Sequence, residues 1–186
     1  MSTTTVRATL DDLMRTEGKA ELIGGRVVTY MASGHLPSTI AFRIARKLAD
    51  FADDTGRGIA YADGIGFAVE ELPSGRESFS PDAAYFTGAL PANLMRFIEG
   101  VPDFAVEVRS ENDYGPAAER DMAAKRADYF AAGTLVVWDV DPDAEEVRVY
   151  RADRPLEPAV YGLGAHADAE PAVPGWTLDV SWLMRN

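Results

Sequence analysis

The feature that most constrains the fold of this chain is a strand–helix–strand run in its second half. Residues 104–109 (Phe-Ala-Val-Glu-Val-Arg) alternate in polarity, which predicts a β-strand with Glu107 on one face and the valines on the other. Pro116 suits the first turn of a helix and Gly133 suits its end. Residues 134–139 predict a second, buried strand. Because a short loop joins the first strand to the helix, the helix is expected to pack back over the sheet.

Three charged residues fall where these elements should be buried. Asp82 lies in the stretch 79–86, which predicts another mostly buried strand, and Glu107 lies in the strand described above. Lys125 is in the middle of an apolar helical stripe. The stripe has spacings of four, three and four residues and consists of Ala118, Met122, Lys125 and Tyr129. Charges are rarely buried without a partner or a metal ion, so we expect the helix to bring Lys125 towards Glu107.

The remaining elements follow one another without a clear linker. They are a short helix at 10–15, a hairpin at 20–30, an amphipathic helix at 38–51 and short strands at 58–61, 66–70, 79–86 and 146–150. Thr9 is the expected N-cap of the first helix, and Gly24-Gly25 is the expected hairpin turn. Residues 1–7 should be flexible, and residues 154–175 should form an irregular tail with one edge strand. The order predicts one α/β or α+β domain, a central mixed sheet flanked by helices.

The composition limits the function further. The chain has 186 residues, enough for one domain with a sizeable core, and no cysteine, which excludes disulfides and thiolate zinc sites. No apolar stretch approaches the ~20 residues of a membrane span. The first five residues lack a signal pattern, so we expect a cytoplasmic protein without a membrane partner. The net charge of −12 argues against tight nonspecific binding of nucleic acid, although it leaves room for a local basic cleft.

Two carboxylates beside a lysine suit the hydrolysis of a phosphodiester bond. Asp82 and Glu107 offer the hard oxygen ligands that Mg²⁺ or Mn²⁺ prefers, while water fills the other positions. A metal held there acidifies a water and neutralises developing charge. Lys125 could orient the attacking water or stabilise the transition state. The only histidines are His35 and His166, so no histidine cluster competes for a softer metal.

A series of short motifs gives these residues a family context. The motifs are residues 21–27 (Glu-Leu-Ile-Gly-Gly-Arg-Val), His35, Pro81-Asp82, residues 102–110 (Pro-Asp-Phe-Ala-Val-Glu-Val-Arg-Ser), Lys125, Tyr129, Gly133 and residues 137–142 (Val-Trp-Asp-Val-Asp-Pro). Their order and spacing, from about residue 8 to residue 150, resemble the Uma-type endonuclease family. This family belongs to the restriction-endonuclease-like PD-(D/E)XK superfamily.

The resemblance implies a restriction-endonuclease-like mixed sheet flanked by helices, with Asp82 and Glu107 as metal ligands and Glu21 as an additional acidic member of the site. The superfamily's usual lysine comes two residues after the second carboxylate, where this chain has Arg109. Arginine cannot serve as a base, although it can bind phosphate. The Uma-type branch places the lysine on the following helix, at Lys125. The implied substrate is nucleic acid, with DNA expected, and a homodimer remains open because nucleases that cut both strands of a duplex often dimerise.

Each of these residues also has a structural explanation. Asp82 could start a turn, Glu107 could form a structural ion pair, and Lys125 could extend its amine to solvent. If Lys125 is catalytic, Lys125→Met is expected to preserve the fold, because methionine is unbranched and suits the same apolar stripe. Glu21 could be a surface residue of its strand, and His35 a helix-start residue or a direct member of the site. Asp139, Asp141 and Asp143 lack the glycine and glutamate of a calcium loop, so we expect a solvated turn there.

Three functions therefore stay open. The first is a Mg²⁺-dependent endonuclease, the second is a catalytically silent relative that binds or assembles, and the third is a metal-dependent hydrolase of a small phosphate ester. Clustering of Asp82, Glu107 and Lys125 favours the first and third. A basic groove wide enough for a duplex separates the first from the third. The arginines expected to form that groove are Arg43, Arg46, Arg109, Arg120 and Arg126.

Overall fold

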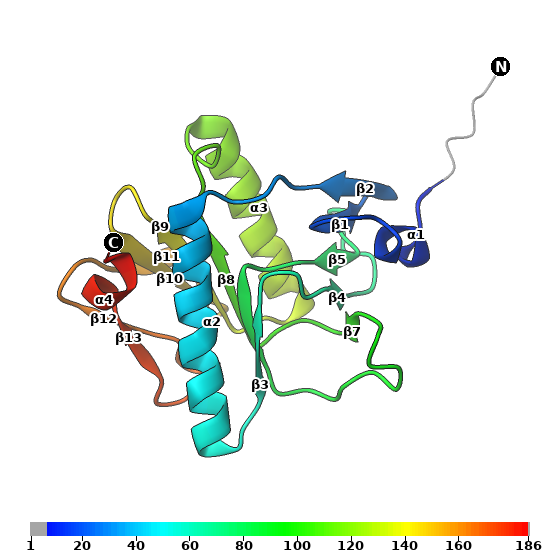
Figure 1. Ribbon diagram of the computed structural model, residues 1–186. Helices are drawn as coiled ribbons and strands as arrows, with labels where there is room; N and C mark the ends of the chain where they lie inside the picture. Colours follow the sequence, from blue (N-terminus) through cyan, green and yellow to red (C-terminus); the bar gives the residue numbers. More distant parts are fainter. Residues whose placement is uncertain (1–6, 186) are drawn as a thin grey trace.

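A six-stranded mixed sheet forms the centre of the computed structural model, which describes residues 7–185 (Figure 1). In spatial order its strands are β11 (Arg154–Tyr161), β10 (Glu146–Arg151), β9 (Val136–Asp141), β8 (Phe104–Val108), β6 (Ala83–Phe86) and β3 (Ile59–Ala62). Neighbouring strands run antiparallel except for β8 and β9, which are parallel. The expected central mixed sheet is thereby confirmed.

The parallel pair needs a long crossover, and helix α3 (Pro116–Ala132) provides it. Pro116 occupies the first turn, where its missing N–H leaves no hydrogen bond unmade. Gly133 ends the helix with a φ of 112°, which residues other than glycine rarely adopt. Its N–H caps the last turn. Both predicted ends of this helix are confirmed.

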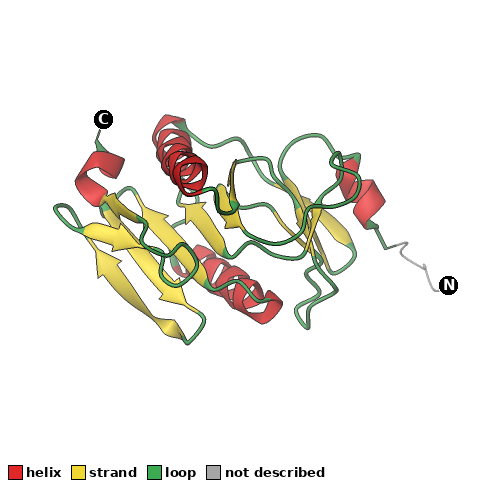
Figure 2. Cartoon of the chain, turned by 90° about the horizontal axis from the view of Figure 1, so that it is seen from below, coloured by secondary structure: helices red, strands yellow, loops and turns green. Residues whose placement is uncertain are grey.

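The two long helices cover opposite faces of the sheet (Figure 2). Helix α2 (His35–Thr55) buries Ile40, Ile44 and Leu48 against one face, together with Phe104 and Val106 of β8. Helix α3 covers the other face. There its Tyr129 packs against Phe79, Ala84, Ala105 and Val137. The predicted alternation of β8 is therefore confirmed, and Glu107 faces α3.

Smaller elements surround this core. Helix α1 (Leu10–Met14) precedes the hairpin of β1 (Ala20–Ile23) and β2 (Arg26–Thr29), and a three-stranded sheet contains β5 (Ser78–Phe79), β4 (Phe67–Ala68) and β7 (Ile98–Glu99). The hairpin of β12 (His166–Asp168) and β13 (Thr177–Asp179) leads to helix α4 (Val180–Met184). Thr9 caps α1 as predicted. Within residues 7–185, no helix combines the length and the apolar character needed to cross a bilayer.

Some boundaries differ from the sequence prediction. The strand expected at 79–86 is divided between β5 and β6, because Pro81 has no N–H and the N–H of Ser80 is donated to the carboxylate of Glu21. Helix α2 is longer than the predicted 38–51, since its first turn tolerates Pro37. The expected tail at 154–175 contains the edge strand β11 and also β12. The expected flexible segment 1–7 lies outside the described residues except for Arg7, which pairs with Glu71 and Glu77.

Candidate functional site

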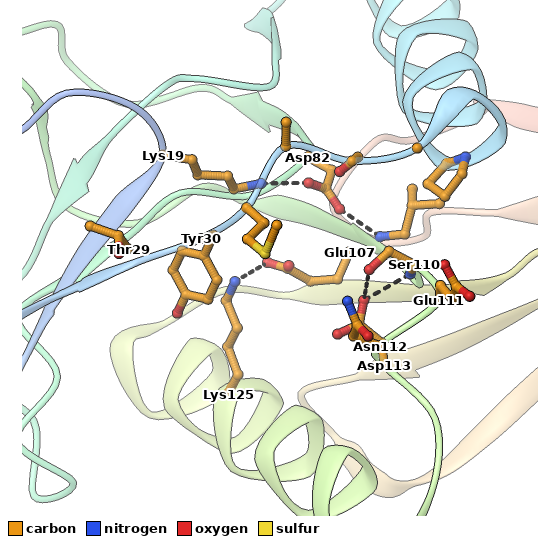
Figure 3. Close-up of a pocket in the computed structure, with 16 residues that line it drawn as sticks. Lys19, Thr29, Tyr30, Asp82, Glu107, Ser110, Glu111, Asn112, Asp113 and Lys125 are labelled. Atoms are coloured by element: carbon orange, nitrogen blue, oxygen red, sulfur yellow. Dashed lines mark hydrogen bonds and ion pairs between the residues drawn. The ribbon is translucent and has the colours of Figure 1, made fainter.

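A cavity of about 620 Å³ opens between the β1–β2 hairpin, the start of α2, the end of β8 and helix α3 (Figure 3). Four charged side chains of its wall point toward one another in pairs. Lys19 faces Asp82, and Lys125 faces Glu107. Two carboxylates and two ammonium groups, contributed by four different parts of the chain, thus meet at one opening.

Asp82 is held by the backbone of the neighbouring strand. It lies one residue before β6, and its N–H donates to the carbonyl of Val106 at 2.9 Å. Its Oδ2 accepts the N–H of Val108 at 2.7 Å, while its Oδ1 lies 2.5 Å from Nζ of Lys19. Asp82 therefore does more than start a turn, since both its oxygens have partners at the mouth of the cavity.

Glu107 lies on the face of β8 that α3 covers. Its Oε1 accepts a hydrogen bond from the Tyr129 hydroxyl at 2.7 Å and lies 2.8 Å from Nζ of Lys125. Burial raises the pKa of Glu107, and the nearby charge of Asp82 adds to this increase although Lys125 opposes it. Both contacts fall on Oε1, so the carboxylate is oriented through one oxygen.

Lys125 is held between two carboxylates, as its place on the stripe of α3 predicted. Its Nζ lies 2.8 Å from Glu107 and 3.0 Å from Glu21, and the rings of Tyr30 and Tyr129 are about 6 Å away. Burial lowers its pKa, but the attraction of Glu107 and Glu21 outweighs burial and leaves the pKa raised. Its side chain is only 15% exposed, so the alternative of an amine extended to solvent is wrong.

Glu21 lies behind Lys125 and is fully buried. It forms an ion pair with Arg76, accepts the N–H of Ser80 at 2.9 Å and accepts the Tyr30 hydroxyl at 2.7 Å. Burial raises its pKa, but Lys125 and Arg76 outweigh that effect and bring the pKa to about 2. Glu21 is not among the residues that line the cavity. Its position suits an anchor for Lys125, and the alternative of a surface residue is wrong.

Arg109, the residue in the superfamily's usual lysine slot, does not line the cavity. Its guanidinium contacts both oxygens of Asp139 at 2.7 Å and the carboxylate of Glu119, and only 4% of the side chain is exposed. Arg126 donates to the same Asp139 at 3.0 Å. Asp139 and Asp141 are buried in β9, so the expected solvated turn is wrong for them, whereas Asp143 lies in an exposed turn after the strand. The aspartates serve as partners for arginines in a structural network.

The arginines expected to line a basic groove are mostly engaged elsewhere. Arg43 donates to the carbonyls of Leu183 and Arg185, and Arg46 lies over the ring of Trp182. Arg109 and Arg126 pair with Asp139, and Arg120 is exposed on α3, so none of the five candidates lines the cavity. His35 is the exposed first residue of α2 and does not line the cavity either.

Lys19 is the member of this cluster that the sequence analysis missed. Its Nζ contacts Asp82 and also lies 2.9 Å from Asp63. Lys19 precedes Glu21 by two residues at the start of the hairpin, so both side chains are directed to the same side. The signal present in the sequence was this spacing, together with the scarcity of lysine: the chain has only Lys19, Lys47 and Lys125.

The donor set fits a hard divalent cation in part. Asp82 and Glu107 both reach the cavity with oxygen ligands, and Mg²⁺ is commonly bound through one or two carboxylates while keeping several waters. Among residues 7–185, however, no group of three or more histidine, aspartate or glutamate side chains is placed to hold a metal ion. The protein alone therefore offers two ligands, and a third must come from water or substrate.

Comparison with known proteins places the chain in a wider context. The family model Uma2, described as "Putative restriction endonuclease", matches residues 7–181. A crystal structure described as a putative nuclease belonging to DUF820, from Anabaena variabilis, superimposes with a TM-score of 0.73 at 20% sequence identity, covering 95% of this chain and 97% of that one. At this identity the similarity shows a shared fold. No curated protein matches the chain in sequence.

Proposed function

Because the chain belongs to the Uma2 family, whose model is described as "Putative restriction endonuclease", we propose that it is a metal-dependent nuclease that hydrolyses phosphodiester bonds of nucleic acid, with DNA as the expected substrate. The family match and the structural neighbour support a nuclease-like function. The metal, the nucleic acid and the residues in the roles given below are parts of the proposal. A homodimer stays a prediction.

The observation that supports this proposal most is the convergence of Asp82, Glu107 and Lys125 on one cavity. Asp82 comes from the residue before β6, Glu107 from β8 and Lys125 from α3, so three separate elements aim charged groups at one place. Burying charged groups is unfavourable unless they are paired or bind a ligand. A site that pairs them and still opens to solvent suits catalysis better than it suits a core.

Each residue has a distinct proposed role. Asp82 and Glu107 would hold Mg²⁺, with Mn²⁺ as a substitute, and the metal would supply an activated water and neutralise charge on the phosphate. Lys125 has a raised pKa and is therefore a cation at neutral pH, so it would stabilise the charged transition state and would not act as a base. Glu21 and Tyr129 would keep Lys125 and Glu107 in position.

One observation favours a second candidate function, hydrolysis of a small phosphate ester. None of the arginines expected to bind a duplex lines the cavity, and its wall contains Glu111 and Asp113. A polyanion would be repelled by these carboxylates, whereas a small ester would fit a cavity of about 620 Å³. The two candidates use the same metal ligands and differ in the size of the substrate.

The test is a cleavage assay on circular duplex DNA, single-stranded DNA, RNA and bis(p-nitrophenyl) phosphate, each with Mg²⁺, Mn²⁺ or a chelator. Cleavage of nucleic acid that requires the metal and disappears in Asp82→Asn and Glu107→Gln supports the nuclease. Glu99→Gln, at an exposed position of β7, is the control and should cleave normally. Turnover of the small ester alone supports the second candidate. Inactivity of the folded protein on every substrate supports the silent relative.

A further inference from the structure

Lys19 has a place in this cavity that differs from the place of Lys125. Lys125 is fixed on a packed helix between Glu21, which is fully buried, and Glu107, which is 16% exposed. Lys19 lies just before β1, and its second partner, Asp63, is 51% exposed. One lysine is therefore enclosed by its partners, whereas the other stands between the cavity and an exposed carboxylate.

Lys19 also occupies the oxygen of Asp82 that a metal would need. Oδ2 of Asp82 accepts the N–H of Val108, and Oδ1 lies 2.5 Å from Nζ of Lys19. A divalent cation at Oδ1 would be repelled by an ammonium group at the same oxygen, because like charges a few ångströms apart in a partly buried site interact strongly. Metal binding at Oδ1 of Asp82 thus requires Lys19 to move, while Oδ2 keeps its backbone donor.

Asp63 is a second ion-pair partner that can hold Lys19 after it leaves Asp82. The ammonium of a lysine is a compact charge on a flexible stem, so it can exchange partners without moving the backbone. The exposed Asp63 can keep the ammonium at the edge of the cavity, where a phosphate oxygen of a bound substrate would also be within reach. Without Lys19, the charges of Asp82 and Glu107 at the cavity would be less compensated.

We propose that Lys19 is a displaceable counter-ion of the catalytic centre: it holds Asp82 until a divalent metal binds, and it then contacts the phosphate that the metal brings. This inference rests on the proposed function, since it concerns the same metal and the same phosphate. It assigns Lys19 two successive partners, a carboxylate before metal binding and a substrate afterwards. Lys125, in contrast, keeps its partners throughout.

The first test measures Mn²⁺ affinity by calorimetry, without substrate. Lys19→Met should bind Mn²⁺ about tenfold more tightly than the wild type or better, because the competing charge is gone. Lys47→Met is the matched control. It removes the same charge from an exposed pair with Asp50 on α2 and should leave the affinity unchanged. Asp82→Asn should lose binding in either background.

The second test asks whether Asp63 acts through Lys19. Asp63→Asn removes the alternative partner of Lys19, so it should weaken Mn²⁺ binding in the wild type and have a smaller effect in the Lys19→Met background. An equal effect in both backgrounds would mean that Asp63 attracts the metal directly. In that case Asp63 is no acceptor for the displaced lysine, and the proposal is wrong.

The third test concerns substrate. Lys19→Met should raise KM for the cleaved substrate at saturating Mn²⁺ by about tenfold and lower kcat less, since a phosphate contact is lost while the metal remains. If wild type and Lys19→Met bind Mn²⁺ equally, the displacement is refuted and the nuclease proposal stands. If neither protein binds Mn²⁺ or cleaves, both proposals fail. If only Lys19→Met binds Mn²⁺, the competition is stronger than proposed, and its direction is confirmed.

Discussion

Lys125 shows how one side chain can serve stability and chemistry together. Its ammonium compensates Glu107 and the fully buried Glu21. From its place on an apolar stripe, Lys125→Met was expected to preserve the fold. The two ion pairs reverse that expectation, because removing one partner leaves a buried charge unpaired.

We therefore predict that Lys125→Met lowers the free energy of unfolding by about 3 kcal/mol. It should also reduce metal-dependent cleavage by roughly 10²–10³-fold where the protein is still folded, because a transition-state stabiliser is lost. Urea denaturation and single-turnover cleavage below the melting temperature measure the two effects separately. A variant as stable as the wild type would show that Glu107 becomes protonated or that water reaches Glu21.

Glu21 gives the protein a specific dependence on acid. Burial raises the pKa of Glu21, but Lys125 and Arg76 outweigh burial and lower it from 4.5 to about 2. Since the folded pKa is below the unfolded one, the stabilisation is fully present above about pH 4.5 and is lost as the pH falls through about 2. At neutral pH it is on the order of 3 kcal/mol.

Glu21→Gln should therefore be less stable than the wild type at pH 7, and the difference should shrink between about pH 4.5 and pH 2. Chemical denaturation of both proteins across this range measures the difference. Glu107 opposes the trend, since burial raises its pKa and protonation favours the folded state. A constant difference between wild type and Glu21→Gln would mean that Glu21 is not the group that titrates.

At the scale of elements, the β1–β2 hairpin positions Lys19 and Glu21, and its own conformation depends on a turn of two glycines. Gly24 and Gly25 have φ values of 60° and 69°, which suits a two-residue turn with both central residues left-handed. The hairpin is bound to β5 and its flanks by a few hydrogen bonds, among them Glu77 N–H to the Leu22 carbonyl at 2.9 Å and Leu22 N–H to Ser78 Oγ at 2.7 Å. Lys19 and Glu21 depend on this attachment.

Gly24→Ala should cost about 1 kcal/mol, because nothing crowds the new methyl and only the left-handed backbone is penalised. Gly56→Ala is the matched control, since Gly56 has a φ of 64°, equally open surroundings and a place at the end of α2. Both variants should lose similar stability in thermal unfolding. Only Gly24→Ala should also weaken Mn²⁺ binding or cleavage. Equal activity in both would show that the hairpin tolerates distortion.

The elements also show what the sequence could and could not predict. Periodicity and end signals were sufficient for α3 and the alternation of β8, which together placed Lys125 beside Glu107. The break at Pro81 was missed because it depends on a distant partner, Glu21, which takes the N–H of Ser80. Arg109 and Asp139 were misjudged for the same reason, since their pairing joins β8 to β9. Lys19 was missed because it lies in a loop before β1, where the sequence periodicity does not show which carboxylate its side chain contacts.

For the whole molecule, charge is the dominant property. The net charge is −12, and the cavity wall combines Lys19 and Lys125 with four carboxylates: Asp82, Glu107, Glu111 and Asp113. A polyanion should therefore bind weakly until a divalent cation offsets the negative charge of the cavity wall. Association with nucleic acid should depend on the metal before any bond is cut.

We predict that fluorescence anisotropy detects little binding of labelled DNA in chelator and clear binding with Ca²⁺, used as a cation expected to support binding with little cleavage. The logarithm of affinity should fall with the logarithm of salt with a shallow slope of about −3 or less in magnitude, because few phosphates contact cations of the protein. Tight, metal-independent binding with a steep slope would reveal a basic surface outside the cavity.

The place of α3 between β8 and β9 has a consequence for biosynthesis. A chain emerging from the ribosome exposes its N-terminal parts first. When residues up to about 112 are out, Lys19, Glu21, Asp82 and Glu107 have all been made, but Lys125 and the parallel neighbour of β8 have not. Arg76 alone then balances Glu21, and Glu107 has no lysine from α3. The site is therefore complete only after α3 and β9 have been made. A nascent chain that ends before β9 does not contain the assembled site.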